Sequence, residues 1–299
     1  MEFAFFIEVL AGGLLAGVMY SLVALGFVLI YKASGVFNFA QGAMVFFAAL
    51  TFVSLVERGV NFWLALLITL AVMVVLGIAT EKVVLRPLVN QPPITLFMAT
   101  IGLTFVLEGL SQLVWGSQPH GLELGIPDVP MEWLSQKTNI NISQFDLFAA
   151  VVSGVLVAAL ALFFQKTRIG RALRAVADDH QAALAVGIPL KQIWAIVWAV
   201  AGFVALVAGL MWGVRNGVQY ALTFVALKAL PVLILGGFES IAGAIIGGLI
   251  IGASEKLAEV YLGPYVGGGI EYWFAYVIAL VFLLVRPQGL FGEKIIERV

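Results

Sequence analysis

Long apolar stretches separated by short polar segments account for most of the chain. An α-helix needs about 20 apolar residues to cross a bilayer. The pattern predicts membrane helices at nine places: Phe5–Tyr31, Val36–Val56, Phe62–Leu85, Ile94–Trp115, Phe145–Phe164, Gln192–Trp212, Leu222–Leu235, Ile241–Val260 and Glu271–Val285. Leu222–Leu235 is short and contains Pro231, so we expect a broken helix or one half of a re-entrant pair. The predicted fold is all-α, a polytopic membrane protein with about eight to ten transmembrane helices, some broken or re-entrant.

The composition supports a membrane protein. Hydrophobic residues make up 62% of the 299 residues and charged residues 11%, and the mean hydropathy is +1.08. A soluble domain has roughly 25% charged residues. The net charge of −1 argues against nucleic acid as a partner. The absence of Cys excludes disulfides and thiolate metal sites, and we expect no metal, no cofactor and no catalytic residue. Residues 1–299 are expected to form a single transmembrane domain.

Lys and Arg set the expected orientation, because they resist transfer across the membrane. Most of the 16 Lys and Arg residues lie on one side if the N-terminus is outside, so we predict an N-out, C-in topology. The N-terminus is acidic, and we expect it to begin the first span rather than a cleaved signal peptide. Residues 116–143 then form an external loop, and residues 165–190 form a cytoplasmic loop.

The cytoplasmic loop is the densest charged stretch of the chain and has a helical pattern of its own. Its apolar residues fall on one helical stripe: Leu173, Val176, Ala177 and Leu184. Asp178 is suited to cap a new turn with Gln181 at its third position, and Gly187 before Pro189 is typical of a helix end. We therefore predict a short helix or a helix pair. It either docks a partner protein or lies on the bilayer surface among anionic headgroups.

A row of polar residues at helical spacing runs along the predicted span Ile94–Trp115. It contains Thr100, Thr104, Glu108 and either Ser111 or Gln112. A charged side chain inside the bilayer marks a functional candidate. The alternative is a structural role, in which Glu108 pairs with Lys228 or accepts hydrogen bonds from hydroxyl groups of other helices.

Small residues and aromatic residues predict packing. Gly243 with Gly247, and Gly248 with Gly252, form small-xxx-small patterns that allow close helix approach, within the subunit or at a dimer face. Trp and Tyr residues near the span ends are predicted to anchor at the membrane interface. They are Tyr31, Trp115, Trp194, Trp212, Tyr261 and Tyr272.

Four segments together resemble one family. They are Tyr20–Met44, which contains NFAQG, Thr167–Ile188, Leu235–Gly252 and Arg286–Gly292. These segments are similar to signatures of ABC importer permeases for branched-chain amino acids, specifically the smaller of the two paired permeases. That family commonly has His and Glu where this chain has Gln41 and Ala43, which leaves the substrate open. Importers of urea and short-chain amides share the general pattern.

The resemblance implies a multi-pass permease of the bacterial inner membrane that is not itself an enzyme. The expected partners are a second homologous permease subunit, two cytoplasmic ATP-binding subunits, an external or periplasmic substrate-binding protein, membrane lipid and a hydrophobic amino acid. The ATPase-coupling residues are then expected to be Arg171, Arg174, Asp178, Asp179, His180 and Gly187. The expected translocation path contains Asn38, Gln41, Thr100, Thr104 and Glu108.

Two other classes of function fit the sequence less well. The sequence lacks the phosphate-binding pattern G-x-x-x-x-G-K-S/T, so ATP would have to be hydrolysed by a separate subunit. An ion-coupled secondary transporter would need no such subunit, but only Glu108 and Lys228 qualify as its intramembrane ion site. A membrane enzyme is disfavoured, because the spans contain no paired carboxylates, His cluster or nucleophile–base set.

Overall fold

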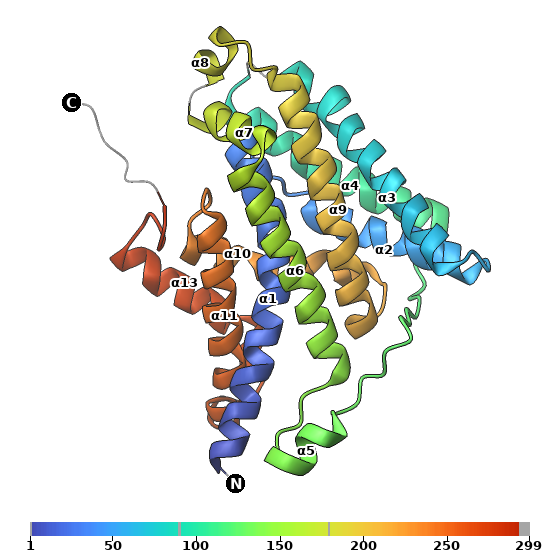
Figure 1. Cartoon of the computed structure of the whole chain (residues 1–299), viewed down its shortest axis with the longest axis vertical. Helices are drawn as coiled ribbons and strands as arrows, with labels where there is room; N and C mark the ends of the chain where they lie inside the picture. Colours follow the sequence, from blue (N-terminus) through green and yellow to red (C-terminus); the bar gives the residue numbers. More distant parts are fainter. Residues whose placement is uncertain (1, 89–90, 179, 293–299) are drawn as a thin grey trace. The chain divides into compact units, whose positions relative to one another are not determined.

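Helices make up the regular structure of the described chain, residues 2–88, 91–178 and 180–292 of the computed structural model (Figure 1). The α-helices are α1 (Glu2–Ser34), α2 (Gln41–Glu57), α3 (Phe62–Ala79), α4 (Pro93–Trp115), α5 (Glu132–Thr138), α6 (Gln144–Lys166), α7 (Arg168–Asp178), α8 (His180–Ala185), α9 (Leu190–Asn216), α10 (Val225–Gly236), α11 (Ile241–Tyr261), α12 (Gly263–Val266) and α13 (Phe274–Val285). A π-helical turn, Thr80–Leu85, and a 3-10 turn, Arg86–Leu88, continue α3. Further 3-10 turns, Tyr220–Phe224 and Ile270–Tyr272, precede α10 and α13.

The predicted spans coincide with helices. Within the described ranges, six helices are long and apolar enough to cross a membrane by length and composition. Three shorter apolar segments, Gln41–Glu57, Tyr220–Gly236 and Phe274–Val285, complete the set. These nine segments lie at the nine predicted places, so the predicted all-α polytopic fold is confirmed.

Two predicted spans differ in detail from the structure. The span predicted from Val36 becomes helical only at Gln41, because Gly35 adopts a left-handed conformation with φ of +66° and ends α1. The span Leu222–Leu235 begins as a 3-10 turn and continues through Pro231 as α10. The helical conformation ends only after α10, at Gly237, which has φ of +100°.

The helices form two compact units. The first comprises the described residues within Met1–Ala24, Leu124–Ala158 and Lys228–Val299. Its α1 and α11 run antiparallel and meet at glycines: a Cβ on Gly17 would lie 2.5 Å from the Gly248 carbonyl oxygen, and one on Gly13 would lie 2.7 Å from that of Gly252. Gly243 and Gly247 approach α10 instead, at Gly236 and Val232. Both small-xxx-small patterns therefore serve packing within the subunit.

The second unit comprises Leu25–Glu123 and Ala159–Leu227. Its α9 packs closely on α3, because a Cβ on Gly77 would lie 2.5 Å from the Trp198 carbonyl oxygen and one on Gly202 would lie 2.7 Å from that of Met73. Gly209 of α9 approaches the Val45 carbonyl of α2 in the same way. Close backbone approach at small residues is the usual basis of helix association in membranes, where burial of apolar surface gives little drive.

Two of the predicted interface anchors are buried instead. Trp194 and Trp212 both lie in the core, and the Trp194 Nε1 donates a hydrogen bond of 2.9 Å to the Ala33 carbonyl at the end of α1. This bond satisfies the indole N–H inside the protein, so the side chain needs no place at the membrane surface. The prediction was wrong for these two residues. Tyr261 and Tyr272 are exposed.

The glycine contact between α1 and α11 gives a test of packing. Gly17→Ala is expected to lower stability by about 1–3 kcal/mol, because the added methyl group meets the backbone of α11. Gly12→Ala is the matched control, since a Cβ at Gly12 has no heavy atom within 4 Å. Thermal denaturation in detergent measures both. Equal melting temperatures for the two variants would contradict the packing described here.

Candidate functional site

The break between α1 and α2 is built from polar side chains. Residues 36–40 are not helical, so their backbone groups need other partners. The Asn38 Oδ1 accepts a hydrogen bond of 3.1 Å from the Ala40 backbone N–H, and the Asn38 Nδ2 donates one of 3.2 Å to the Gln41 Oε1. Both side chains are fully buried. The structure therefore brings together two of the residues predicted from the sequence.

A third predicted residue, Thr100 of α4, joins this break. Its hydroxyl group lies 3.1 Å from the Phe37 carbonyl oxygen and accepts a hydrogen bond of 3.4 Å from the Phe39 backbone N–H. The rings of Phe37 and Phe39 contact each other, with centroids 4.6 Å apart, and Phe39 contacts Phe97 of α4 at 4.7 Å. Thr100 therefore provides hydrogen-bond partners for backbone groups of the non-helical residues 36–40, beside the aromatic rings of Phe37, Phe39 and Phe97. We call residues 36–40 with Gln41 and Thr100 the polar break.

One donor of the polar break has no partner. The Gln41 Nε2 is buried and has no hydrogen-bond partner among the described atoms. It lies against Gly26 of α1, where an added Cβ would be only 2.5 Å from this nitrogen. Burying an amide nitrogen without an acceptor costs free energy. The Gln41 Nε2 is therefore the atom of the polar break that can donate a further hydrogen bond.

The rest of the row on α4 extends away from the break. Glu108 and Ser111 are buried, Thr104 is half-buried and Gln112 is exposed, so the row continues through Ser111. The Thr104 hydroxyl donates to the Thr100 carbonyl within the same helix. Glu108 accepts a hydrogen bond of 3.4 Å from the hydroxyl group of Tyr220.

Glu108 and Lys228 each have a partner within their own unit. Lys228 pairs with Glu255 of α11, with Nζ 3.0 Å from Oε1, whereas Glu108 has the hydroxyl partner described above. Sequence reasoning did not identify Tyr220 or Glu255. Glu255 lies seven residues after Gly248, on the face of α11 that packs on α1, and a carboxylate on a glycine stripe is a signal that was present in the sequence.

The predicted cytoplasmic loop is a helix pair. Thr167 caps the N-terminus of α7, because its Oγ1 accepts a hydrogen bond of 3.1 Å from the Gly170 backbone N–H. Gly170 allows the tight turn after α6, since a Cβ there would collide with the Phe164 backbone. The Arg174 guanidinium donates hydrogen bonds to the carbonyl oxygens of Phe164 (2.6 Å) and Gln165 (3.3 Å). Arg174 therefore closes the end of α6, where a cation also suits the helix dipole.

The second helix of the pair ends as predicted. Gly187 has φ of +83°, its N–H bonds to the Leu184 carbonyl at 3.0 Å, and the Ile188 N–H bonds to the Ala183 carbonyl at 2.9 Å. These two bonds form a Schellman motif with Gly187 at the C′ position. Pro189 precedes α9, so the predicted end of the helix is confirmed.

The predicted apolar stripe of the loop holds only in α7. Leu173 and Val176 are buried, but Leu184 is 55% exposed and Ala183 is buried in its place. The stripe fails because α7 and α8 are separate helices, so the spacing of one does not carry into the other. Arg171 is exposed. Asp179 lies outside the described residues, and so do the side chains of Asp178, His180 and Gln181.

Comparison with known proteins identifies the family. The model of the family described as branched-chain amino acid transport system / permease component matches residues 9–286. The chain belongs to this family. It is 28% identical to the high-affinity branched-chain amino acid transport system permease protein LivH of Escherichia coli, covering 100% of this chain and 99% of LivH. It is also 28% identical to the corresponding protein BraD of Pseudomonas aeruginosa, with the same coverage.

A solved structure supports the fold. A chain in the structure of PsaBC from Streptococcus pneumoniae in complex with Fab superposes with a TM-score of 0.50 at 13% sequence identity. The match covers 96% of this chain and 97% of that chain. The two chains therefore share a fold over nearly the whole length of each.

Thr100→Val tests whether the polar break depends on α4. The substitution removes the hydroxyl group that serves Phe37 and Phe39, and we expect a stability loss of about 1–3 kcal/mol because buried backbone groups lose a partner. Thr104→Val is the matched control, since its hydroxyl bonds only within α4. The melting temperature should fall for Thr100→Val and change little for Thr104→Val. The reverse order of effects would refute the role given to Thr100.

Proposed function

We propose that this protein is a transmembrane permease subunit of an ATP-driven importer for branched-chain amino acids, in the inner membrane of a bacterial cell. Its main support is the family match over residues 9–286, together with relatives that are similar over their full length and are named for branched-chain amino acid transport. The topology in this proposal is N-out and C-in, which the distribution of Lys and Arg favours.

The proposed importer contains further subunits. They are a second homologous permease, two cytoplasmic ATP-binding subunits and an external substrate-binding protein. The sequence lacks a phosphate-binding loop, which favours energy supply by a separate subunit. The single permease domain would then supply only the path and the surface that receives the ATP-driven movement.

We place the contact with the ATP-binding subunits on the α7–α8 helix pair. Leu184 and Val186 are 55% and 76% exposed at its end, next to the Schellman motif that fixes the backbone. Arg171 is exposed on α7 and adds a charge to the same pair. Arg174 has a supporting role in this proposal, because its guanidinium is engaged by the end of α6. Asp178, Asp179 and His180 keep the coupling role that the resemblance implies.

The proposed path uses the polar break and the row on α4. The non-helical residues 36–40 contact the side chains of Gln41 and Thr100 and include Asn38. Further along α4, the row that starts at Thr100 continues with Thr104 and Glu108. Interrupted helices of this kind are common at transporter substrate sites. Hydroxyl, amide and backbone groups with little fixed charge suit a zwitterion with an apolar side chain. A polyanion would need opposite charges along the route.

The coupling surface is tested at Leu184. Leu184→Glu places a charge on the exposed apolar end of the helix pair, and we expect uptake and substrate-stimulated ATPase activity to fall at least about tenfold, with membrane insertion unchanged. Leu184→Met keeps the apolar surface and serves as the control. Both are measured in proteoliposomes with the partner subunits. Full ATPase stimulation in the Leu184→Glu variant would exclude this surface as the contact.

The substrate class is tested with vesicles that contain the complete importer and its own binding protein. We expect ATP-dependent uptake of leucine, isoleucine and valine, because the proposed path suits apolar zwitterions. Sugars should not be transported, and an imposed ion gradient without ATP should not drive uptake. Transport of urea or short amides without amino-acid transport would overturn the substrate assignment and leave the permease assignment standing.

A further inference from the structure

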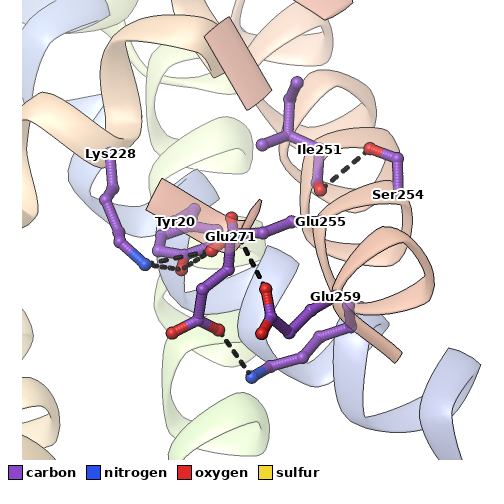
Figure 2. Close-up of polar contacts among 8 residues, drawn as sticks. Tyr20, Lys228, Ile251, Ser254, Glu255, Glu259 and Glu271 are labelled. Carbon is purple, nitrogen blue, oxygen red and sulfur yellow. Dashed lines mark hydrogen bonds and ion pairs between the residues drawn. The ribbon is translucent and has the colours of Figure 1, made fainter. Parts of the chain in front are cut away.

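An ion pair lies within the apolar helices of the first unit. The Lys228 Nζ on α10 is 3.0 Å from the Glu255 Oε1 on α11. The Tyr20 hydroxyl of α1 donates to the same carboxylate oxygen at 3.3 Å, and the Lys228 Nζ is 3.5 Å from the Tyr20 oxygen. Figure 2 shows the three side chains converging from three helices. Charged residues inside membrane helices are costly and mark functional sites.

The two charges of this pair differ in exposure. The Glu255 side chain is 3% exposed and the Lys228 side chain is 28% exposed. An ammonium group has three N–H donors, and the contacts with Glu255 and Tyr20 use two of them, one at the long distance of 3.5 Å. Glu255 therefore holds the lysine in place, and the third N–H donor of the ammonium has no hydrogen-bond partner among the described residues.

The neighbourhood of Lys228 combines aromatic surface with charge. The Nζ lies 5.2 Å from the ring centroid of Tyr272 and 5.9 Å from that of Tyr20, and Tyr272 is 69% exposed. A second ion pair, Lys256 with Glu271 at 3.1 Å, lies on the same unit.

Glu259 completes this charged cluster. It accepts hydrogen bonds of 3.0 Å from the backbone N–H groups of Gly269 and Glu271. The cluster of Lys228, Glu255, Lys256, Glu259 and Glu271 thus has one more acidic than basic residue.

We propose that Lys228 binds the carboxylate of the transported amino acid. An ammonium–carboxylate hydrogen bond is among the strong charge-assisted kinds, and the Tyr272 ring offers apolar surface beside it. This assignment rests on the proposed function, and it makes Lys228 the residue that distinguishes amino acids from uncharged substrates. Lys228 was not among the path residues predicted from the sequence.

The test uses three probes that differ only in their charged groups. They are leucine, isocaproate, which lacks the amino group, and isoamylamine, which lacks the carboxylate. Binding to the purified permease with its ATP-binding subunits, without the binding protein, is measured by calorimetry in neutral detergent. The expected result is that leucine and isocaproate bind and that isoamylamine binds at least about tenfold more weakly.

Two double variants separate recognition from folding. Lys228→Met alone leaves Glu255 buried without a counter-charge, which destabilises the fold, so it is combined with Glu255→Gln. The Lys228→Met, Glu255→Gln double variant should fold and should bind leucine about tenfold or more weakly than the wild type, with isoamylamine binding unchanged. The matched control combines Lys256→Met with Glu271→Gln on the neighbouring ion pair and should bind leucine as the wild type does.

Several outcomes would overturn the assignment of Lys228. They are unchanged leucine affinity in the folded Lys228→Met, Glu255→Gln variant, equal losses for leucine and isoamylamine, and wild-type protein that binds none of the carboxylates. Each of these leaves the proposed function intact if the complete importer still transports leucine. Failure of leucine uptake by the complete importer is a separate result, and it would count against the proposed function.

Discussion

Inside a bilayer no water is available to a polar group, so each one needs a partner within the protein. The helices of this chain meet that requirement for most of the backbone, and the places where they stop are where side chains take over. At the polar break, Asn38 and Thr100 bond the backbone of residues 37–40. Where α6 enters the predicted cytoplasmic loop, the Arg174 guanidinium likewise bonds the last carbonyl groups. The breaks in the helices are therefore built features with named partners.

The same constraint explains the role of glycine. Helices in a membrane gain little from burying apolar side chains against one another, so they associate by close packing and hydrogen bonding. Gly17 with Gly248 in the first unit, and Gly77 with Trp198 in the second, bring backbones within reach. In the first unit this close approach brings the Tyr20 hydroxyl group to the Glu255 carboxylate. Packing and charge pairing are thus parts of one arrangement.

The sequence predicts the features that depend on local chemistry. Nine apolar stretches give nine helical segments because span length and hydropathy are local properties, and Gly187 before Pro189 predicts a helix end because the Schellman motif is local. Contacts between distant residues are not predictable in this way. Glu108 finds Tyr220 over 112 residues, and Glu255 finds Tyr20 over 235 residues. Trp194 likewise has its partner at Ala33, which hydropathy does not encode. Leu184 lies on α8, apart from the α7 residues of the predicted stripe, and is exposed.

We propose that this permease works within a multi-subunit importer driven by ATP. The most direct test of this proposal is to purify the chain from its native membrane in mild detergent and to identify the accompanying proteins and the small molecule on any binding protein by mass spectrometry. We expect an ATP-binding subunit, a second homologous permease and a binding protein that contains leucine, isoleucine or valine. Purification of the chain alone, with uptake in vesicles driven by an ion gradient without ATP, would contradict it.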